Sequence, residues 1–190
     1  MKKKDVAIKR DIHAEIIKAA KHLFNEVGFK KTTIEDIAHE LGMSHANVYR
    51  FFKTKAEINV AVCGQLFSEI EAASEEIARD SGPASKTLRN LIASVERLNS
   101  HHFHRKLHEL LQTAYDEHWP IVREHSKKMD KILEGVICQG MAAGEFRAGD
   151  AELAAILVGS ACMRSLMVQR ARDPEPTTDQ MIDFCLTALA

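Results

Sequence analysis

Residues 33–51 read TIEDIAHELGMSHANVYRF, and this stretch decides the fold. Thr33 and Asp36 have the spacing of a capping box at the start of a helix, and apolar residues then recur every three or four positions until Gly42. Ser44 can cap a second helix after a turn of only three residues. Two short helices joined by a tight turn that contains glycine are typical of a helix-turn-helix.

The helical pattern continues on both sides of this stretch and predicts an all-α chain of nine helices. Aromatic residues make up only 6% of the chain, and no alternating runs of β-branched residues occur, which argues against an all-β sandwich. An apolar stripe from Ile12 to Val27 predicts a helix before the motif. A long amphipathic helix is expected after it, and five more follow. The later helices are expected over residues 55–79, 84–100, 102–117, 120–143, 151–172 and 177–190.

The composition is that of a globular protein, with 45% hydrophobic and 28% charged residues. The longest nearly apolar run, Leu153–Met163, is far shorter than the roughly 20 residues that a membrane helix needs. No apolar segment of the signal-peptide type follows the basic start of the chain. Cys63, Cys138, Cys162 and Cys185 are widely spaced within apolar helical patterns and are interpreted as free core thiols. These features predict a cytoplasmic protein without a membrane span.

Charge is divided unevenly along the chain. Residues 1–55 hold 12 Lys and Arg against 7 Asp and Glu, a net of +5, whereas residues 56–190 hold 14 against 20, a net of −6. A basic head on an acidic body suggests that the head meets a polyanion, although a solvated basic terminus would give the same numbers. The basic residues 2–10 could follow a nucleic-acid backbone as a flexible arm, or form a solvated tail.

The second short helix begins with side chains suited to reading bases. His45, Ala46 and Asn47 lie in its first turn, where a recognition helix presents side chains to base edges. Asn can pair with adenine, His can donate to guanine, and Ala can pack against a thymine methyl group. Val48 lies on the opposite side and is expected in the core.

The stretch from Thr32 to Lys55, with residues 19–29 before it, resembles the DNA-binding domain of the TetR family of bacterial regulators. The resemblance covers roughly residues 10–60. The rest of the chain fits that family in its length, its helicity and the Gly144-Glu145-Phe146 element before the penultimate helix.

Two domains follow from this resemblance. It implies an N-terminal three-helix helix-turn-helix domain over residues 1–54, joined by the long helix to a C-terminal helical bundle. That bundle, residues 55–190, is expected to bind a ligand and to dimerise.

The resemblance gives Tyr49 and Lys55 phosphate contacts, with Thr33 at the start of the first short helix, and we add Arg50 and Lys53 as further contacts. The predicted DNA-binding residues are Thr33, Ser44, His45, Ala46, Asn47, Tyr49, Arg50, Lys53 and Lys55. Tyr49 could instead be a core aromatic. Glu35 could accept from cytosine N4, but we favour a helix-start charge that interacts with the helix dipole.

The predicted function is a dimeric transcriptional repressor that a small hydrophobic or amphipathic effector releases from a palindromic operator in double-stranded DNA. The alternative is a DNA-bound structural or cell-division factor of the same fold that recruits a protein partner. The sequence contains none of the metalloprotease, hydrolase or P-loop motifs that would indicate catalysis. We therefore expect no enzyme activity and no cofactor.

Two sets of residues are assigned to the C-terminal bundle. Aromatic and apolar side chains are predicted to line an effector pocket, although any one of them could be core. The pocket candidates are Phe67, Phe103, Leu107, Leu111, Tyr115, Trp119 and Met163. The last two helices carry wide apolar faces, and in the resembled family this pair forms a four-helix interface with its twin. The homodimer candidates are Leu153, Leu157, Ser160, Met163, Met167, Met181, Phe184, Cys185 and Leu189, with Ala154, Gly159 and Ala161 allowing close approach.

Six of the ten histidines lie between residues 101 and 125. His101, His104 and His108 share one helical face and could present imidazoles to a transition metal. We favour the simpler interpretation, a partly exposed polar face or the lining of a pocket, and predict no metal site.

Overall fold

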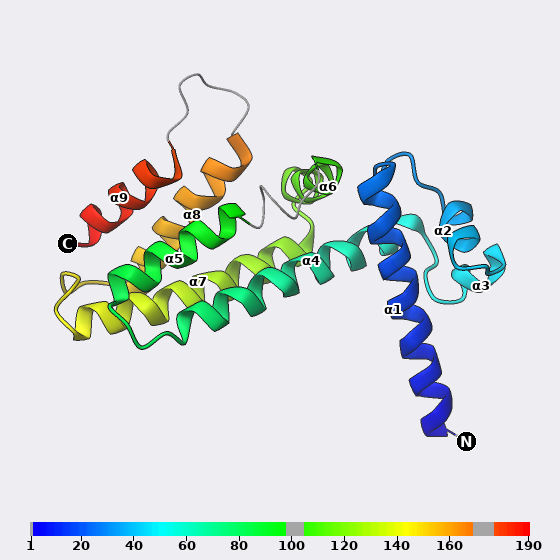
Figure 1. Ribbon diagram of the computed structural model, residues 1–190, viewed down its shortest axis with the longest axis horizontal. Coiled ribbons are helices and arrows are strands. Elements are labelled where there is room, and N and C mark those ends of the chain that lie inside the picture. The colour runs from blue at the N-terminus through cyan, green and yellow to red at the C-terminus, as the bar shows by residue number, and fades with distance from the viewer. Residues whose placement is uncertain (1, 98–104, 169–176) are drawn as a thin grey trace. The chain divides into compact units, whose positions relative to one another are not determined.

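The computed structural model describes residues 2–97, 105–168 and 177–190, with side chains over 12–94, 106–162 and 177–190. Within these ranges the chain forms nine helices and no strand, which confirms the predicted all-α class (Figure 1). The helices are α1 (Lys2–Glu26), α2 (Ile34–Glu40), α3 (His45–Tyr49), α4 (Lys55–Ala78), α5 (Ala84–Arg97), α6 (Arg105–Asp116), α7 (Pro120–Ala142), α8 (Ala151–Val168) and α9 (Thr178–Leu189).

The chain divides into two compact units. Unit 1 comprises Met1–Leu66 and Phe103–Ile121, and unit 2 comprises Phe67–His102 and Val122–Ala190. Helix α4 contributes its first half to unit 1 and its second half to unit 2. These units do not coincide with the domains expected from the sequence, because α6 packs against α1 and so belongs to the unit that carries the helix-turn-helix.

In unit 1, α2 packs against both α1 and α3 around buried apolar residues. Ile16, Phe24 and Ile37 are fully buried in this core. Helix α1 starts at Lys2, so the backbone of its basic first turns is helical. Val27 is also exposed rather than inward-facing, because α1 ends at Glu26.

Two features outside the predicted apolar stripe of residues 12–27 determine where α1 ends. Gly28 has a φ of +101°, a conformation that costs glycine little, and it turns the chain away from the helix axis. The Lys106 ammonium of α6 donates to the Glu26 carbonyl, so a cation meets the negative end of the α1 dipole.

Unit 2 gathers α5, α7, α8, α9 and the second half of α4 (Figure 1). Its core includes Leu88, Leu91, Ile137 and Ile182, from three of these helices. The Phe146 ring lies so close to Gly140 that a Cβ atom on residue 140 would collide with it. Glycine at this position therefore lets the segment that follows α7 pack closely against the helix.

Glu145 ties that segment to the start of α5. Its carboxylate accepts from the Ala84 N–H at 2.8 Å, the Ser85 N–H at 3.1 Å and the Ser85 hydroxyl at 2.7 Å. These bonds satisfy amide donors that have no partner within α5. They favour the charged carboxylate, so the backbone and side-chain bonds from Ser85 and the Ala84 bond lower the pKa of Glu145 below its ordinary 4.5.

We predict that Glu145→Gln lowers the urea midpoint of unfolding at pH 7, because an amide that faces the N-terminal amides of α5 cannot accept all three bonds. A carboxylate with a depressed pKa stabilises the fold above its unfolded pKa, and this contribution is lost as pH falls through the lower folded value. The difference from wild type should therefore shrink below pH 4.5. Glu124→Gln, at an exposed position of α7, is the control, and an equal loss in both variants would contradict this role.

Candidate nucleic-acid interface

The backbone of residues 33–44 is fixed by its own polar atoms. Asp36 accepts from the Thr33 N–H at 2.8 Å, and Thr33 Oγ1 accepts from the Asp36 N–H at 3.1 Å, which confirms the predicted capping box. The hydrogen bonds that the Asp36 carboxylate accepts from the Thr33 N–H and hydroxyl hold the pKa of Asp36 below its ordinary value. After α2, Gly42 takes a φ of +60°, and this lets the Met43 N–H reach the Ala38 carbonyl at 2.9 Å.

Helix α3 starts at a capped and exposed end. Ser44 Oγ accepts from the Asn47 N–H at 3.3 Å, as the sequence predicted. His45, Ala46 and Asn47 are all exposed, whereas Val48 is fully buried. The first turn of α3 is therefore free to meet a groove, while one apolar side chain docks the helix on unit 1.

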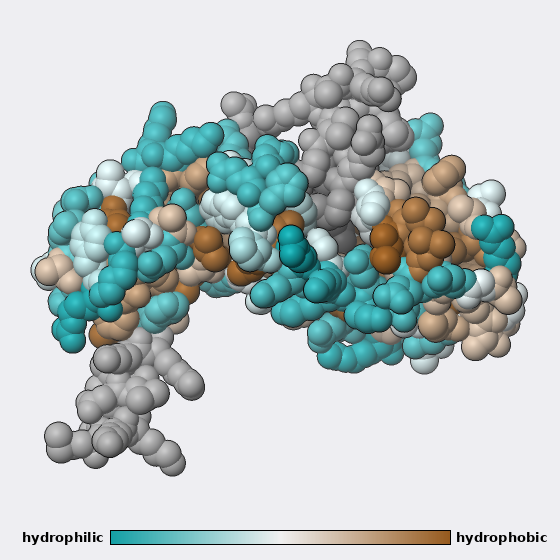
Figure 2. All heavy atoms as spheres, turned by 180° about the vertical axis from the view of Figure 1, so that it is seen from behind, coloured by the Kyte–Doolittle hydropathy of each residue, from teal (hydrophilic) through white to brown (hydrophobic). Residues whose placement is uncertain are grey.

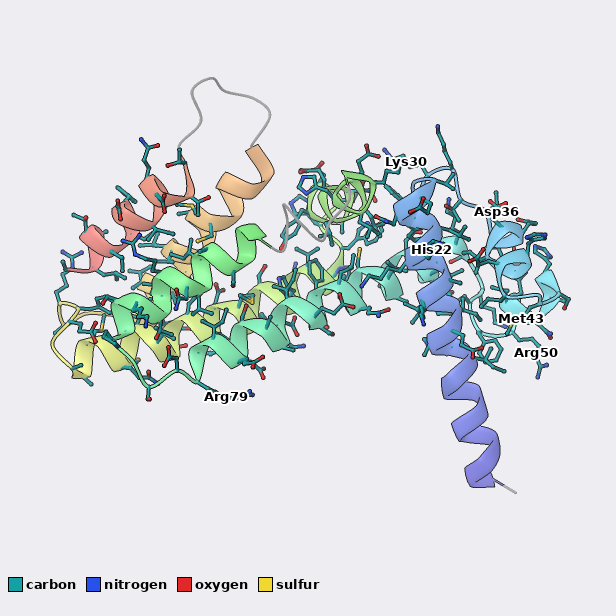
Figure 3. All side chains as sticks on the ribbon, in the orientation of Figure 1. His22, Lys30, Asp36, Met43, Arg50 and Arg79 are labelled. Atoms are coloured by element: carbon teal, nitrogen blue, oxygen red, sulfur yellow. The ribbon has the colours of Figure 1, made fainter. Side chains whose placement is uncertain are left out.

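The C-terminal end of α3 adds a phenol and a cation to the same surface. Tyr49 is 37% exposed and is therefore not a core aromatic. Arg50, the C-terminal cap of α3, is exposed, and Figure 3 labels it together with Met43, which precedes the Ser44 cap.

His45 has two neighbours on this surface. Its Nε2 lies 2.8 Å from Oε1 of Glu35 in the first turn of α2. Its ring meets the Tyr49 ring edge to face, with centroids 4.6 Å apart. The sequence treated Glu35 as a charge on the helix dipole, but only the tertiary structure shows that it reaches the first residue of α3.

Two lysines at the start of α4 are anchored by backbone carbonyls. Lys55 Nζ donates to the Lys30 carbonyl at 3.3 Å, and burial lowers the pKa of Lys55 although nearby Asp36 opposes this. Lys53 Nζ donates to the Tyr49 carbonyl at 3.1 Å. Each ammonium keeps further N–H groups for a phosphate. Sequence reasoning did not identify Lys30 as a residue of this surface. The only indication of its role in the sequence is its place in the basic loop before Thr33.

The start of α4 carries an altered capping box. Thr54 Oγ1 accepts from the Glu57 N–H at 3.2 Å. The Glu57 carboxylate, however, accepts from the N–H of Lys53 at 2.7 Å, one residue before the cap. This bond orders the Lys53 backbone beside α3.

The pocket candidates are distributed over both units. Leu107 and Leu111 are buried in unit 1, where Tyr115 and Trp119 are half-buried. Trp119 Nε1 donates to the Glu117 carboxylate at 2.8 Å. Phe67 is buried in unit 2. Phe103 and the side chain of Met163 lie outside the described residues.

Phe67 lies beside a buried polar cluster in unit 2. Its ring stacks on His125 with centroids 4.2 Å apart. His125 Nδ1 is 2.9 Å from one oxygen of Glu71, and Lys128 Nζ donates to the other at 2.8 Å. Burial lowers the pKa of His125, which favours its neutral form. Burial acts to raise the pKa of Glu71, but the bonds from Lys128 and His125 outweigh it, so the pKa is lowered.

The predicted dimer residues fall into three groups. Leu153, Leu157, Ser160 and Phe184 are exposed, Leu157 by 61% and Phe184 by 71%, and Met181 is half-buried. Figure 2 shows an apolar surface over this part of α8 and α9. Ile156, which the prediction omitted, is also exposed on α8.

The other dimer candidates are not available to a partner in the same way. Cys185 and Leu189 are buried in the core of unit 2. Gly159 is packed against Asp130 and Leu133 of α7, so it allows close approach within the chain. The side chains of Met163 and Met167 lie outside the described residues.

Two of the three metal candidates, His101 and His104, lie outside the described residues. The third, His108, lies on α6. Among the residues that are described, no three His, Cys, Asp or Glu side chains group as metal ligands would. Within the same ranges, none of the helices combines the length and apolar character needed to cross a bilayer.

Comparisons with known proteins match two successive parts of the chain to separate family models. The family model of bacterial regulatory proteins of the tetR family matches residues 16–62, and a tetracyclin repressor-like C-terminal domain matches residues 84–181. An uncharacterized HTH-type transcriptional regulator of Bacillus subtilis, YhgD, is 27% identical over 151 residues, which is 75% of this chain and 76% of that protein.

Solved structures share the fold. A transcriptional regulator from Cytophaga hutchinsonii has a TM-score of 0.76 at 21% identity and covers 92% of this chain and 96% of its own. The regulator FadR from Bacillus subtilis, solved in complex with stearoyl-CoA, has a TM-score of 0.69 at 19% identity and covers 93% and 99%.

Proposed function

The chain belongs to the TetR family of bacterial regulatory proteins, and we propose that it is a DNA-binding transcriptional repressor that a small hydrophobic or amphipathic effector releases from a palindromic operator. The observation that carries this proposal is the exposed first turn of α3, which is capped by Ser44 and docked through Val48. Proteins of this family are regulators, and we assign no catalytic step to any residue. The cytoplasm, where the chromosome lies, is the proposed site of action.

The exposed side chains divide by chemistry into base readers and phosphate contacts. Asn47, His45 and Ala46 lie in the first turn of α3 and are assigned to base edges in the major groove. Tyr49 and Lys55 are assigned to phosphates. Thr33, Ser44, Arg50 and Lys53 complete the proposed surface.

We predict that Asn47→Ala and Lys55→Ala weaken DNA binding in different ways. The first should cost about 1–3 kcal/mol on an operator selected from random duplexes and relax preference at one or two positions. The second should weaken binding to all sequences alike and lower the salt slope by about 1, because it removes one phosphate contact. Fluorescence anisotropy against salt concentration measures both, with Lys86→Ala on α5 as the control. Identical losses on operator and random DNA for both variants would remove the assignment.

We further propose that the protein binds DNA as a homodimer through the exposed apolar face of α8 and α9. A single head offers few base contacts, so a specific site requires two heads. Leu153, Leu157 and Phe184 are large apolar residues that one chain leaves exposed. A second copy would cover them, with Ser160 and Met181 at the same surface.

Leu157→Glu combined with Phe184→Asp is expected to give a monomer, because the partner face would have to bury two carboxylates. Light scattering at micromolar concentration measures the mass, and operator affinity should fall with it. Lys18→Glu, an exposed change on α1, should leave the dimer intact. If the wild-type protein is a monomer under these conditions, the proposed homodimer is wrong.

The proposed release mechanism uses α4 as the connecting element. This helix starts with Lys55 at the DNA surface and runs into unit 2 without a break. In a dimer, two recognition helices must sit about 34–36 Å apart, one DNA turn, or a multiple of it. An effector that binds better to a differently spaced state releases DNA, and a coupling of about 1–3 kcal/mol changes affinity 5–150-fold.

The effector is proposed to contact the apolar candidates of unit 1 named above, Leu107, Leu111, Tyr115 and Trp119. A hydrophobic or amphipathic ligand suits these side chains, and the stearoyl-CoA bound to the FadR relative is one such molecule. That relative supports the class of ligand and does not identify the effector of this chain.

Trp119 is the only tryptophan, so its fluorescence can report on binding. We expect stearoyl-CoA, used as a first amphipathic probe, to change this emission and to release operator DNA. Trp119→Ala should leave DNA affinity unchanged and raise the probe concentration needed for release, because the residue is assigned to the effector and not to DNA. Failure of amphipathic probes of several chain lengths to release DNA would favour the alternative in which the body recruits a protein partner.

A further inference from the structure

We propose that Glu35 is a specificity-determining residue, which fixes the hydrogen-bonding edge that His45 presents to a DNA base. The proposal rests on the DNA-binding function proposed above. It starts from one contact, the 2.8 Å approach of Glu35 Oε1 to His45 Nε2, which joins the first turn of α2 to the first residue of α3.

A carboxylate at this place calls for an explanation, because a surface that meets phosphates loses affinity for each negative charge it carries. Asp36 has a structural task, since it makes the capping bonds of α2 with Thr33. The capping box does not use Glu35, whose side chain is 66% exposed. Its partner is His45, one of the residues assigned to base reading.

The chemistry of the contact determines the proton position. A carboxylate only accepts hydrogen bonds, so His45 Nε2 must be the donor. In a neutral imidazole with its proton on Nε2, the other nitrogen, Nδ1, carries a lone pair and can only accept. The edge-to-face contact with Tyr49 restrains the same ring from a second side.

This arrangement changes the base that His45 should prefer. In the major groove, adenine N6 and cytosine N4 are donors, whereas guanine O6 and N7 and thymine O4 are acceptors. A ring that offers an acceptor therefore selects adenine or cytosine, and the guanine contact expected from the sequence is disfavoured. Without Glu35, the ring can take the other tautomer and offer a donor to guanine.

Two substitutions separate this positioning role from a simple charge effect. Glu35→Gln keeps an oxygen that can accept from Nε2 and removes the charge, so it should bind all DNA more tightly and keep the wild-type base preference. Glu35→Ala removes the charge and the acceptor. It should bind more tightly overall, but its preference at the His45 position should move toward guanine by about tenfold.

The experiment is selection from a random duplex library at pH 8, where imidazole is ordinarily neutral, with wild type, both Glu35 variants and His45→Ala. The position that loses preference in His45→Ala is the one His45 reads, and wild type should show adenine or cytosine there. Glu40→Ala is the matched control, because Glu40 faces another histidine of unit 1, His22, at 3.9 Å. It should leave base preference unchanged.

Other results would overturn the inference. If Glu35→Ala and Glu35→Gln select the same sequences as wild type, Glu35 contributes charge alone. If His45→Ala changes no base preference, or if wild type selects guanine at that position, the proposed reading edge is wrong while DNA binding stands. If wild type selects no sequence at all, the proposed function itself fails.

Discussion

A helix of five residues cannot be stable on its own hydrogen bonds, so the proposed DNA surface depends on how α3 is attached to unit 1. The attachment has three parts: the Ser44 cap at its start, the fully buried Val48 in its middle, and Phe52 after its end, whose ring stacks on His13 of α1 at 4.4 Å. The Phe51 and Phe52 amides both donate to the Val48 carbonyl at 3.0 Å. Every exposed side chain of α3 takes its direction from these few fixed points.

The electrostatics of unit 1 follow from the same geometry. Acidic groups beside a proposed polyanion site have local partners: Asp36 caps α2, Glu57 orders the Lys53 amide, and Glu35 meets His45. A carboxylate near DNA repels phosphates. In each of these three contacts the carboxylate also makes a hydrogen bond that orders the local structure. The cations Lys53 and Lys55 are held by neutral backbone carbonyls, which do not cancel their positive charge. A nearly neutral chain can therefore still present a cation at the C-terminal end of α3, where Lys53 lies.

Unit 2 combines a closed core with two features that stability alone does not explain. The first is the apolar face of α8 and α9, where Leu157 and Phe184 are exposed while Cys185 and Leu189 fill the core beneath. The second is the buried Glu71 and its bonds to His125 and Lys128. Desolvation of the Glu71 carboxylate offsets much of its attraction to the exposed Lys128 ammonium, so this contact contributes little net stability. Here it joins α4, the helix that begins at the DNA surface, to α7.

The sequence by itself determined the all-α class, the order of the helices and the helix-turn-helix, because caps, glycines and apolar spacing are local signals. Thr33, Gly42 and Ser44 act within a few residues of themselves, so their roles could be read from neighbours in the chain. Only the tertiary structure decided what depends on packing between helices. Periodicity shows that a helix has an apolar face but not which neighbour covers it. The sequence therefore places Cys185 and Leu189 at a dimer interface, whereas the structure buries them in the core of unit 2. The same holds for the packing of α6 in unit 1 and for the contact between Glu35 and His45. Both bring together residues from different helices, and spacing along the chain does not encode the distance between two helices.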